Sequence, residues 1–167
     1  MKYSATTWRI IKSAMNVHSE LHSGFQEKNY QRAMAIEFDF QKIQYAREVS
    51  KIVLYRNKWV GDKSVDFVVE NVVSVELKAK SNLEREDFAK AFKYLEILNL
   101  EVGLLINFGA ESLQYHRLTN KKFKEIKVDD KSISSDRSEK SDLSSSSEQS
   151  KDFRSYLDLY DDDDIIS

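Results

Sequence analysis

The chain has no cysteine and no proline, and only four of its 167 residues are glycine. Without cysteine there is no disulfide, no thiolate catalysis and no zinc site built on cysteine ligands. No glycine-rich phosphate loop is present, which argues against an ATPase of the P-loop kind. These absences remove several common enzyme classes before any residue is assigned a role.

Long apolar runs are also missing. No stretch approaches the roughly 20 apolar residues that are needed to span a bilayer. The first residues, Met1 to Ile11, do not combine an apolar stretch with a small-residue cleavage site. We therefore expect a soluble, cytoplasmic protein with no membrane partner.

Charge divides the chain into two parts. Up to Lys127 there are 21 Lys+Arg against 16 Asp+Glu, whereas the remaining residues have 5 against 12, and 12 of those last 40 are serine. The second part has too few apolar residues to offset the entropy lost on ordering the chain. We expect one domain over residues 1–125 and a disordered, acidic, Ser/Asp-rich tail over residues 126–167.

One segment of the tail differs from its surroundings. Phe153 to Ile166 places five apolar or aromatic residues before four aspartates, and two isoleucines after them. Such a cluster is typical of a short segment that folds on a protein partner. A plain solubilising tail is the alternative.

Two amphipathic helices are predicted at the start of the chain, because apolar residues recur at three- and four-residue steps. We expect them to be nearly continuous, with a bend at His22 to Gly24. The first helix would pack through Trp8, Ile11, Ala14, Met15, Val17 and Leu21, and the second through Phe25, Tyr30, Ala33, Met34, Ile36 and Phe40.

After Gln41 the apolar period changes to two, which predicts strands at 49–55, 59–69 and 72–80 in an antiparallel meander, with a bulge at Gly61. A helix capped by Ser81 or Asn82 would run to about Leu98. The nearly continuous apolar run at 102–108 predicts a strand that is covered on both faces, and an edge strand is expected at 113–118. The fold class is therefore α/β, a mixed sheet flanked by helices, with Trp8 and Trp59 expected in the core.

One group of polar residues on these strands points to chemistry. Glu76 and Lys78 share a face of their strand because strand side chains alternate, and Asp66 lies on the preceding strand. Opposed side chains on one face of an antiparallel pair are roughly 5 Å apart. Two carboxylates and a backbone carbonyl such as that of Leu77 would suit Mg²⁺, with Lys78 near the attacking water.

Other interpretations stay open at this point. A glutamate and a lysine two residues apart on a strand often form only a weak surface ion pair. His18 and His22 are four residues apart, as two zinc ligands on one helix face would be, but no third ligand has suitable spacing. His18 is more simply expected to pack or to hydrogen-bond near the site.

A wider pattern connects these residues. Gly24 to Tyr30 read G-x-x-E-x-x-Y, and AMAIE (33–37), Val65-Asp66, Val75 to Lys78 and EVGLLINFG (101–109) follow in order. Together they closely resemble the GxxExxY proteins, a group within the PD-(D/E)XK nuclease superfamily. The resemblance runs from about Thr6 to Leu118 and implies a nuclease-like core.

The resemblance also implies roles for individual residues. Asp66 and Glu76 would bind the metal, Mg²⁺ or Mn²⁺, Lys78 would be the catalytic lysine, and Glu27 would be the helix carboxylate that completes the site. Tyr30 lies three residues after Glu27 and shares its helix face. Two positions depart from the pattern: relatives have Leu-Gly-Pro-Gly where this chain has residues 21–24, and glutamine in place of Lys90.

Two functions are consistent with these observations. The first is a metal-dependent nuclease, or a nuclease-like protein that processes nucleic acid by phosphodiester hydrolysis. The alternative is a catalytically weak or inactive nuclease fold that serves as a binding or adaptor module through its acidic tail. A tail that competes with nucleic acid for the basic body would connect the two.

Overall fold

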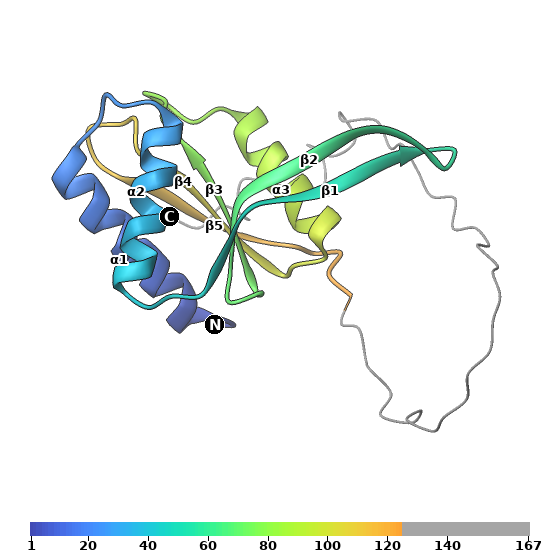
Figure 1. Cartoon of the computed structure of the whole chain (residues 1–167), viewed down its shortest axis with the longest axis horizontal. Coiled ribbons are helices and arrows are strands. Elements are labelled where there is room, and N and C mark those ends of the chain that lie inside the picture. Colours follow the sequence, from blue (N-terminus) through green and yellow to red (C-terminus); the bar gives the residue numbers. More distant parts are fainter. Residues whose placement is uncertain (125–167) are drawn as a thin grey trace, which may run out of the picture.

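The computed structural model describes residues 1–124, which form one mixed sheet and three helices (Figure 1). The strand order is β1-β2-β3-β4-β5, and only β3 and β4 are parallel. This confirms the predicted α/β class, whereas the tail lies outside the described residues. The elements are α1 (Ser4–Leu21), α2 (Glu27–Phe40), β1 (Tyr45–Tyr55), β2 (Lys58–Val69), β3 (Val73–Lys78), α3 (Arg85–Leu98), β4 (Val102–Asn107) and β5 (Gln114–Thr119).

The first two helices form an antiparallel hairpin, so the prediction of a nearly continuous helix was wrong. Asn16 of α1 donates to Glu37 of α2, which places the middle of one helix beside the end of the other. The connection is stabilised by Tyr30, whose hydroxyl donates to the His22 carbonyl (2.7 Å) and accepts from the Phe25 N–H (3.2 Å). Gly24 adopts a positive φ of 114° there, and glycine does so without steric cost.

The faces that the two helices bury are rotated from the predicted ones. Five of the residues predicted to pack are exposed, and for these the prediction of burial was wrong: Trp8 (60%), Met15 (47%), Phe25 (50%), Ile36 (70%) and Phe40 (80%). In α1 the small polar residues Thr7 and Ser13 are buried, and their hydroxyls bond to the carbonyls of Ser4 and Arg9 in the same helix. The buried residues are Thr7, Ile10, Ser13, Ala14 and Val17 in α1, and Tyr30, Met34, Ala35 and Phe38 in α2.

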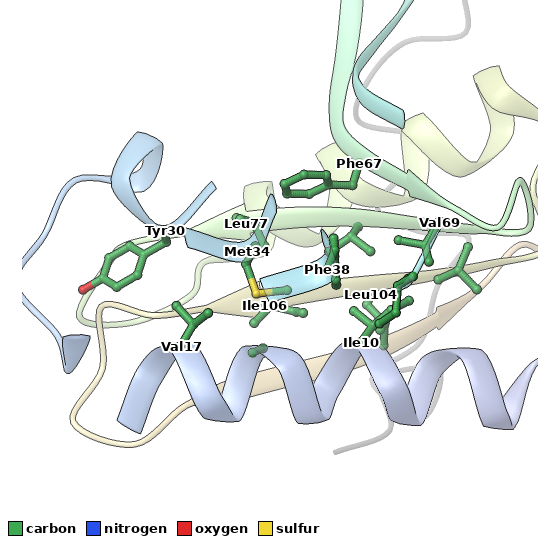
Figure 2. Packing of buried hydrophobic residues seen from close by; sticks show 14 of the residues in the cluster. Ile10, Val17, Tyr30, Met34, Phe38, Phe67, Val69, Leu77, Leu104 and Ile106 are labelled. Atoms are coloured by element: carbon green, nitrogen blue, oxygen red, sulfur yellow. The ribbon is translucent and has the colours of Figure 1, made fainter. Parts of the chain in front are cut away.

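The main core lies between this helical hairpin and one face of the sheet (Figure 2). β3 and β4 are buried along their whole length, because the hairpin covers one face and α3 the other. The prediction that residues 102–108 form a strand covered on both faces is confirmed. Labelled core residues in Figure 2 include Ile10, Met34, Phe38, Phe67, Leu77, Leu104 and Ile106.

Helix α3 begins at Arg85, later than the predicted caps Ser81 and Asn82 allow. Glu84 is the residue before the helix, and its N–H donates to the Asp87 carboxylate (3.0 Å). Lys80 binds Asp87 (2.9 Å) and Glu84 (3.2 Å), which draws the start of the helix toward the end of β3. The carboxylates at the helix start therefore determine its first turn, as the helix dipole favours.

β1 and β2 form a long hairpin that extends away from the helices (Figure 1). We call residues 50–64 the arm. Its turn, Arg56-Asn57, has φ of 48° and 62°, as a two-residue type I′ hairpin turn requires. The register shifts between Val53 and Leu54, opposite Gly61 and Trp59, which confirms the predicted bulge. Trp59 is 65% exposed on the arm, so the prediction that it is a core residue was wrong.

Candidate active site

The candidate site lies where β2 and β3 separate. The two strands pair only from Phe67↔Val75 to Val69↔Val73, and beyond that point β2 continues into the arm. The Leu77 N–H, which a longer ladder would bond to β2, donates instead to Oδ2 of Asp66 (2.7 Å). Because a buried N–H must find an acceptor, the fork in the sheet holds the Asp66 carboxylate against β3.

The second oxygen of Asp66 is bound from the other direction. Gln31 of α2 donates from Nε2 to Oδ1 (3.0 Å), and Arg47 donates to the Gln31 Oε1 (3.2 Å). Burial and the neighbouring Glu76 carboxylate together raise the pKa of Asp66 to about 6, against the lowering effect of the Leu77 N–H. Two hydrogen bonds therefore fix the Asp66 carboxylate in a place where burial and Glu76 disfavour its charged form.

Glu76 is 4% exposed and receives two ammonium groups on one oxygen. Lys78 Nζ lies 2.7 Å from Glu76 Oε1, and Lys90 Nζ lies 3.0 Å from the same atom. Lys78 Nζ also donates to the Leu77 carbonyl (2.8 Å) and lies 3.8 Å from Glu27. The structure thus brings Glu27, Asp66, Glu76 and Lys78 together from three elements, α2, β2 and β3, as the sequence pattern predicts.

Helix α3 contributes Lys90 and Tyr94 from the side that faces Glu76. Burial opposes the charge of Lys90, but Glu76 outweighs it and the pKa of Lys90 is raised. The pKa of Tyr94 is raised by burial and by Glu76. Lys90 was singled out from the sequence, whereas Gln31 and Tyr94 were not. Gln31 lies four residues after Glu27, and Tyr94 lies four residues after Lys90. Residues four apart on a helix share a face, and this spacing is the signal that could have identified Gln31 and Tyr94.

The other two candidates lie outside the group of charged residues. Tyr30 is fully buried, stacks on Phe108 with centroids 4.6 Å apart and closes the turn before Glu27. His18 lies 3.3 Å from the Ala110 carbonyl and beside Phe108. Tyr30 therefore positions the start of α2, and His18 packs at the end of α1.

Among residues 1–124, no three histidine, aspartate or glutamate side chains form a group that would hold a metal ion. The set that fits a hard cation is smaller: the carboxylates of Asp66 and Glu76, with the carbonyl of Leu77, the residue that follows Glu76. Glu76 is buried and Asp66 is half-buried, and the raised pKa of Asp66 reflects its burial first and then its repulsion by Glu76. A cation relieves such repulsion, so the donor set fits one divalent ion.

Comparison with known proteins agrees with this geometry. The family model of the PD-(D/E)XK nuclease superfamily matches residues 4–119, and the chain belongs to that superfamily. Nucleases of the superfamily generally use divalent metals, and the match supports a nuclease-like domain.

One solved structure that resembles the chain is described as the crystal structure of SSO0001. It is 11% identical, covers 72% of this chain and 80% of its own, and has a TM-score of 0.40. At that score the likeness carries no argument about function. No curated protein matches the sequence. Within the described residues, no helix is long and apolar enough to cross a membrane.

Proposed function

We propose that the protein is a metal-dependent nuclease that hydrolyses phosphodiester bonds at the fork between β2 and β3. Within the superfamily we place it in the GxxExxY group, on the pattern from Gly24 to Tyr30. The observation that carries the proposal is the convergence of Asp66, Glu76 and Lys78 around one point, with Lys78 Nζ bonded to Glu76.

Asp66, Glu76 and the Leu77 carbonyl would hold the metal, either Mg²⁺ or Mn²⁺. When bound, the ion supplies positive charge for a phosphate oxygen and lowers the pKa of a coordinated water. The chain's own residues provide the rest. Gln31 and the Leu77 N–H keep the Asp66 carboxylate in one orientation, so that it needs no reorganisation on binding.

Lys78 is the residue that would meet the reacting phosphate. Its ammonium group is fixed by Glu76 and the Leu77 carbonyl and retains a third N–H. That donor can orient the attacking water or neutralise charge that develops on the phosphate oxygens. Glu27, 46% exposed, lies 3.8 Å from Lys78 Nζ on the solvent side of the site.

The direct test is incubation with single- and double-stranded DNA and RNA in Mg²⁺ or Mn²⁺. Asp66→Ala and Lys78→Ala should each abolish cleavage, whereas the exposed controls Asp39→Ala and Lys12→Ala should cleave as the unmodified protein does. Equal residual cleavage by all four variants would identify a contaminating nuclease and overturn the proposal.

A second function is favoured by one observation, the two lysines on Glu76 Oε1. Lys78 and Lys90 together neutralise the carboxylate without a metal, as an inactive binding or adaptor module would permit. Such a module would act through the acidic tail and the segment Phe153 to Ile166, which lie outside the described residues. Unchanged capture of a protein partner after deletion of residues 126–167 would contradict it.

A further inference from the structure

The arm has two chemically different faces. Residues that pair across an antiparallel ladder share a face, and alternate residues on a strand share a face. The pairs Lys51↔Lys63 and Tyr55↔Lys58 therefore lie on one face, whereas Ile52↔Asp62 and Leu54↔Trp59 lie on the other. One face of the arm is basic with a tyrosine at its end, and the other is mostly apolar.

The basic face continues the side of the sheet on which α3 lies. Val49 pairs with Val65, and both pack against Tyr94 of α3 at the base of the arm. Lys51 and Lys63 are the next residues along that face. The Tyr94 ring also lies 5.6 Å from Lys90 Nζ, which is 3.0 Å from Glu76 Oε1. The candidate active site and the basic face of the arm therefore lie on the same side of the sheet, the side that α3 covers.

The lysines on this face are exposed, and their charges are not paired within the part of the chain that the structure describes. Lys51, Lys58 and Lys63 are all exposed, and among residues 1–124 none of them forms an ion pair. The acidic residue of the arm, Asp62, belongs to the other face and accepts from Trp59 Nε1 (3.0 Å). At the tip, the Arg56 guanidinium lies 5.5 Å from the ring of Tyr55, which is 54% exposed.

We propose that the basic face of the arm binds the phosphate backbone of the nucleic acid on one flank of the scissile bond. Exposed lysines that follow one another along a single face neutralise the phosphates of a nucleic-acid backbone. The inference deepens the proposed function, because it identifies how that site would hold its substrate.

Strand geometry gives the reach of the arm. Lys63 is three residues and Lys58 eight residues from Asp66 on β2, or roughly 10 and 26 Å at about 3.3 Å per residue. A duplex rises about 3.4 Å per base pair, so the tip lies about eight base pairs from the scissile phosphate. The arm's contacts should therefore depend on the length of the flank.

The experiment measures binding of the full chain to labelled duplexes by fluorescence anisotropy in EDTA, where no cleavage occurs. Lys58→Glu should weaken binding about threefold or more at low salt, and the triple variant of Lys51, Lys58 and Lys63 about 30-fold. The triple variant should also lower the slope of log K against log salt by about 2.7, because each phosphate contact contributes about 0.9. Lys12→Glu, an exposed lysine of α1, is the matched charge reversal and should change neither quantity by as much.

A truncation series gives the second readout. On duplexes with a flank of four base pairs on either side, Lys58→Glu should bind as the unmodified protein does, whereas a flank of 12 should restore the difference. If the unmodified protein binds and cleaves but the arm variants match Lys12→Glu, the arm inference is wrong and the proposed function stands. If the unmodified protein neither binds nor cleaves nucleic acid, the arm inference and the proposed function are both wrong.

The apolar face offers one rival occupant, a second copy of the chain. Ile52, Leu54 and Trp59 are more than half exposed there, and β1 is an edge strand. Sedimentation velocity on the same variants separates the two. A change of oligomeric state in the arm variants, with unchanged nucleic-acid affinity, would identify a self-association surface and overturn the inference.

Discussion

Asp66 is a buried carboxylate next to another carboxylate, with a pKa raised to about 6 from 3.8 by burial and by Glu76. Compared with the unfolded chain, the folded state therefore favours the protonated form of Asp66. Above pH 6 the charged group costs up to about 3 kcal/mol of stability, at 1.36 kcal/mol per pKa unit. This cost disappears as the pH falls from about 6 toward 3.8.

We expect Asp66→Asn to be more stable than the unmodified protein at pH 8 in EDTA, by up to about 3 kcal/mol, while losing any metal-dependent activity. The gain should be almost gone at pH 4. Urea unfolding of both proteins at the two pH values measures the difference, with Asp39→Asn as an exposed control. An equal gain at both pH values would contradict the electrostatic explanation.

Lys90 occupies the position where a cation competes with the metal for Glu76. Its Nζ lies 3.0 Å from Glu76 Oε1, so removing its charge frees a carboxylate oxygen. Lys90→Gln should bind Mn²⁺ about tenfold more tightly in calorimetric titration, given the size of charge–charge terms in a partly buried site. Unchanged or weaker binding would show that Lys90 does not oppose the metal, and Lys12→Gln is the matched control.

The turn after β4 holds the backbone that follows Lys78. Asn107 is fully buried, accepts from the Lys80 N–H (3.0 Å) and donates to the Lys80 carbonyl (2.8 Å). Gly109 lies directly against this segment, where an added Cβ would come within 2.3 Å of the Lys80 nitrogen. The end of β3 is therefore fixed by the β4–β5 connection.

Gly109→Ala should destabilise the fold by about 3 kcal/mol, because backbone cannot move aside as a flexible side chain can. The urea midpoint is the measurement. Ser112→Ala, an exposed residue of the same connection, should leave the midpoint nearly unchanged. Similar urea midpoints for Gly109→Ala and Ser112→Ala would mean that the backbone at Lys80 moves aside without loss of stability.

The elements with strong periodicity could be predicted from the sequence, and their packing could not. Both helices of the hairpin were identified, but the buried faces differ because Thr7 and Ser13, whose hydroxyls bond within the helix, are buried in place of Trp8. Strand alternation placed Glu76 and Lys78 on one face. The fork at Asp66 depends on the residue at which β2 stops pairing with β3. No local sequence pattern predicts where that pairing ends.

The whole chain combines a basic body with an acidic remainder. Residues up to Lys127 have five more basic than acidic side chains, whereas the full chain has a net charge of −2. Removing residues 128–167 should tighten binding to nucleic acid, and most strongly at low salt, where the tail's repulsion of phosphate is least screened. Anisotropy across a salt series measures this, and identical curves with and without the tail would dispose of tail competition.

Metal binding should also be visible in overall stability. A ligand that binds only the folded state stabilises it by about 2.7 kcal/mol at 100 times its Kd. We expect Mn²⁺ to raise the melting temperature of the unmodified protein and to leave that of Asp66→Ala unchanged. An equal rise in both proteins would place the ion elsewhere.

Because β1 and β2 are joined by a two-residue turn at Arg56-Asn57, the length of the arm can change by insertion of equal numbers of residues into both strands. Adding two residues to each strand lengthens it by roughly 7 Å and keeps every side chain on its original side, whereas adding one to each strand exchanges the sides beyond the insertion. The fork at Asp66 is unaffected in either case. Reach can therefore vary in discrete increments while the chemistry at the base stays the same.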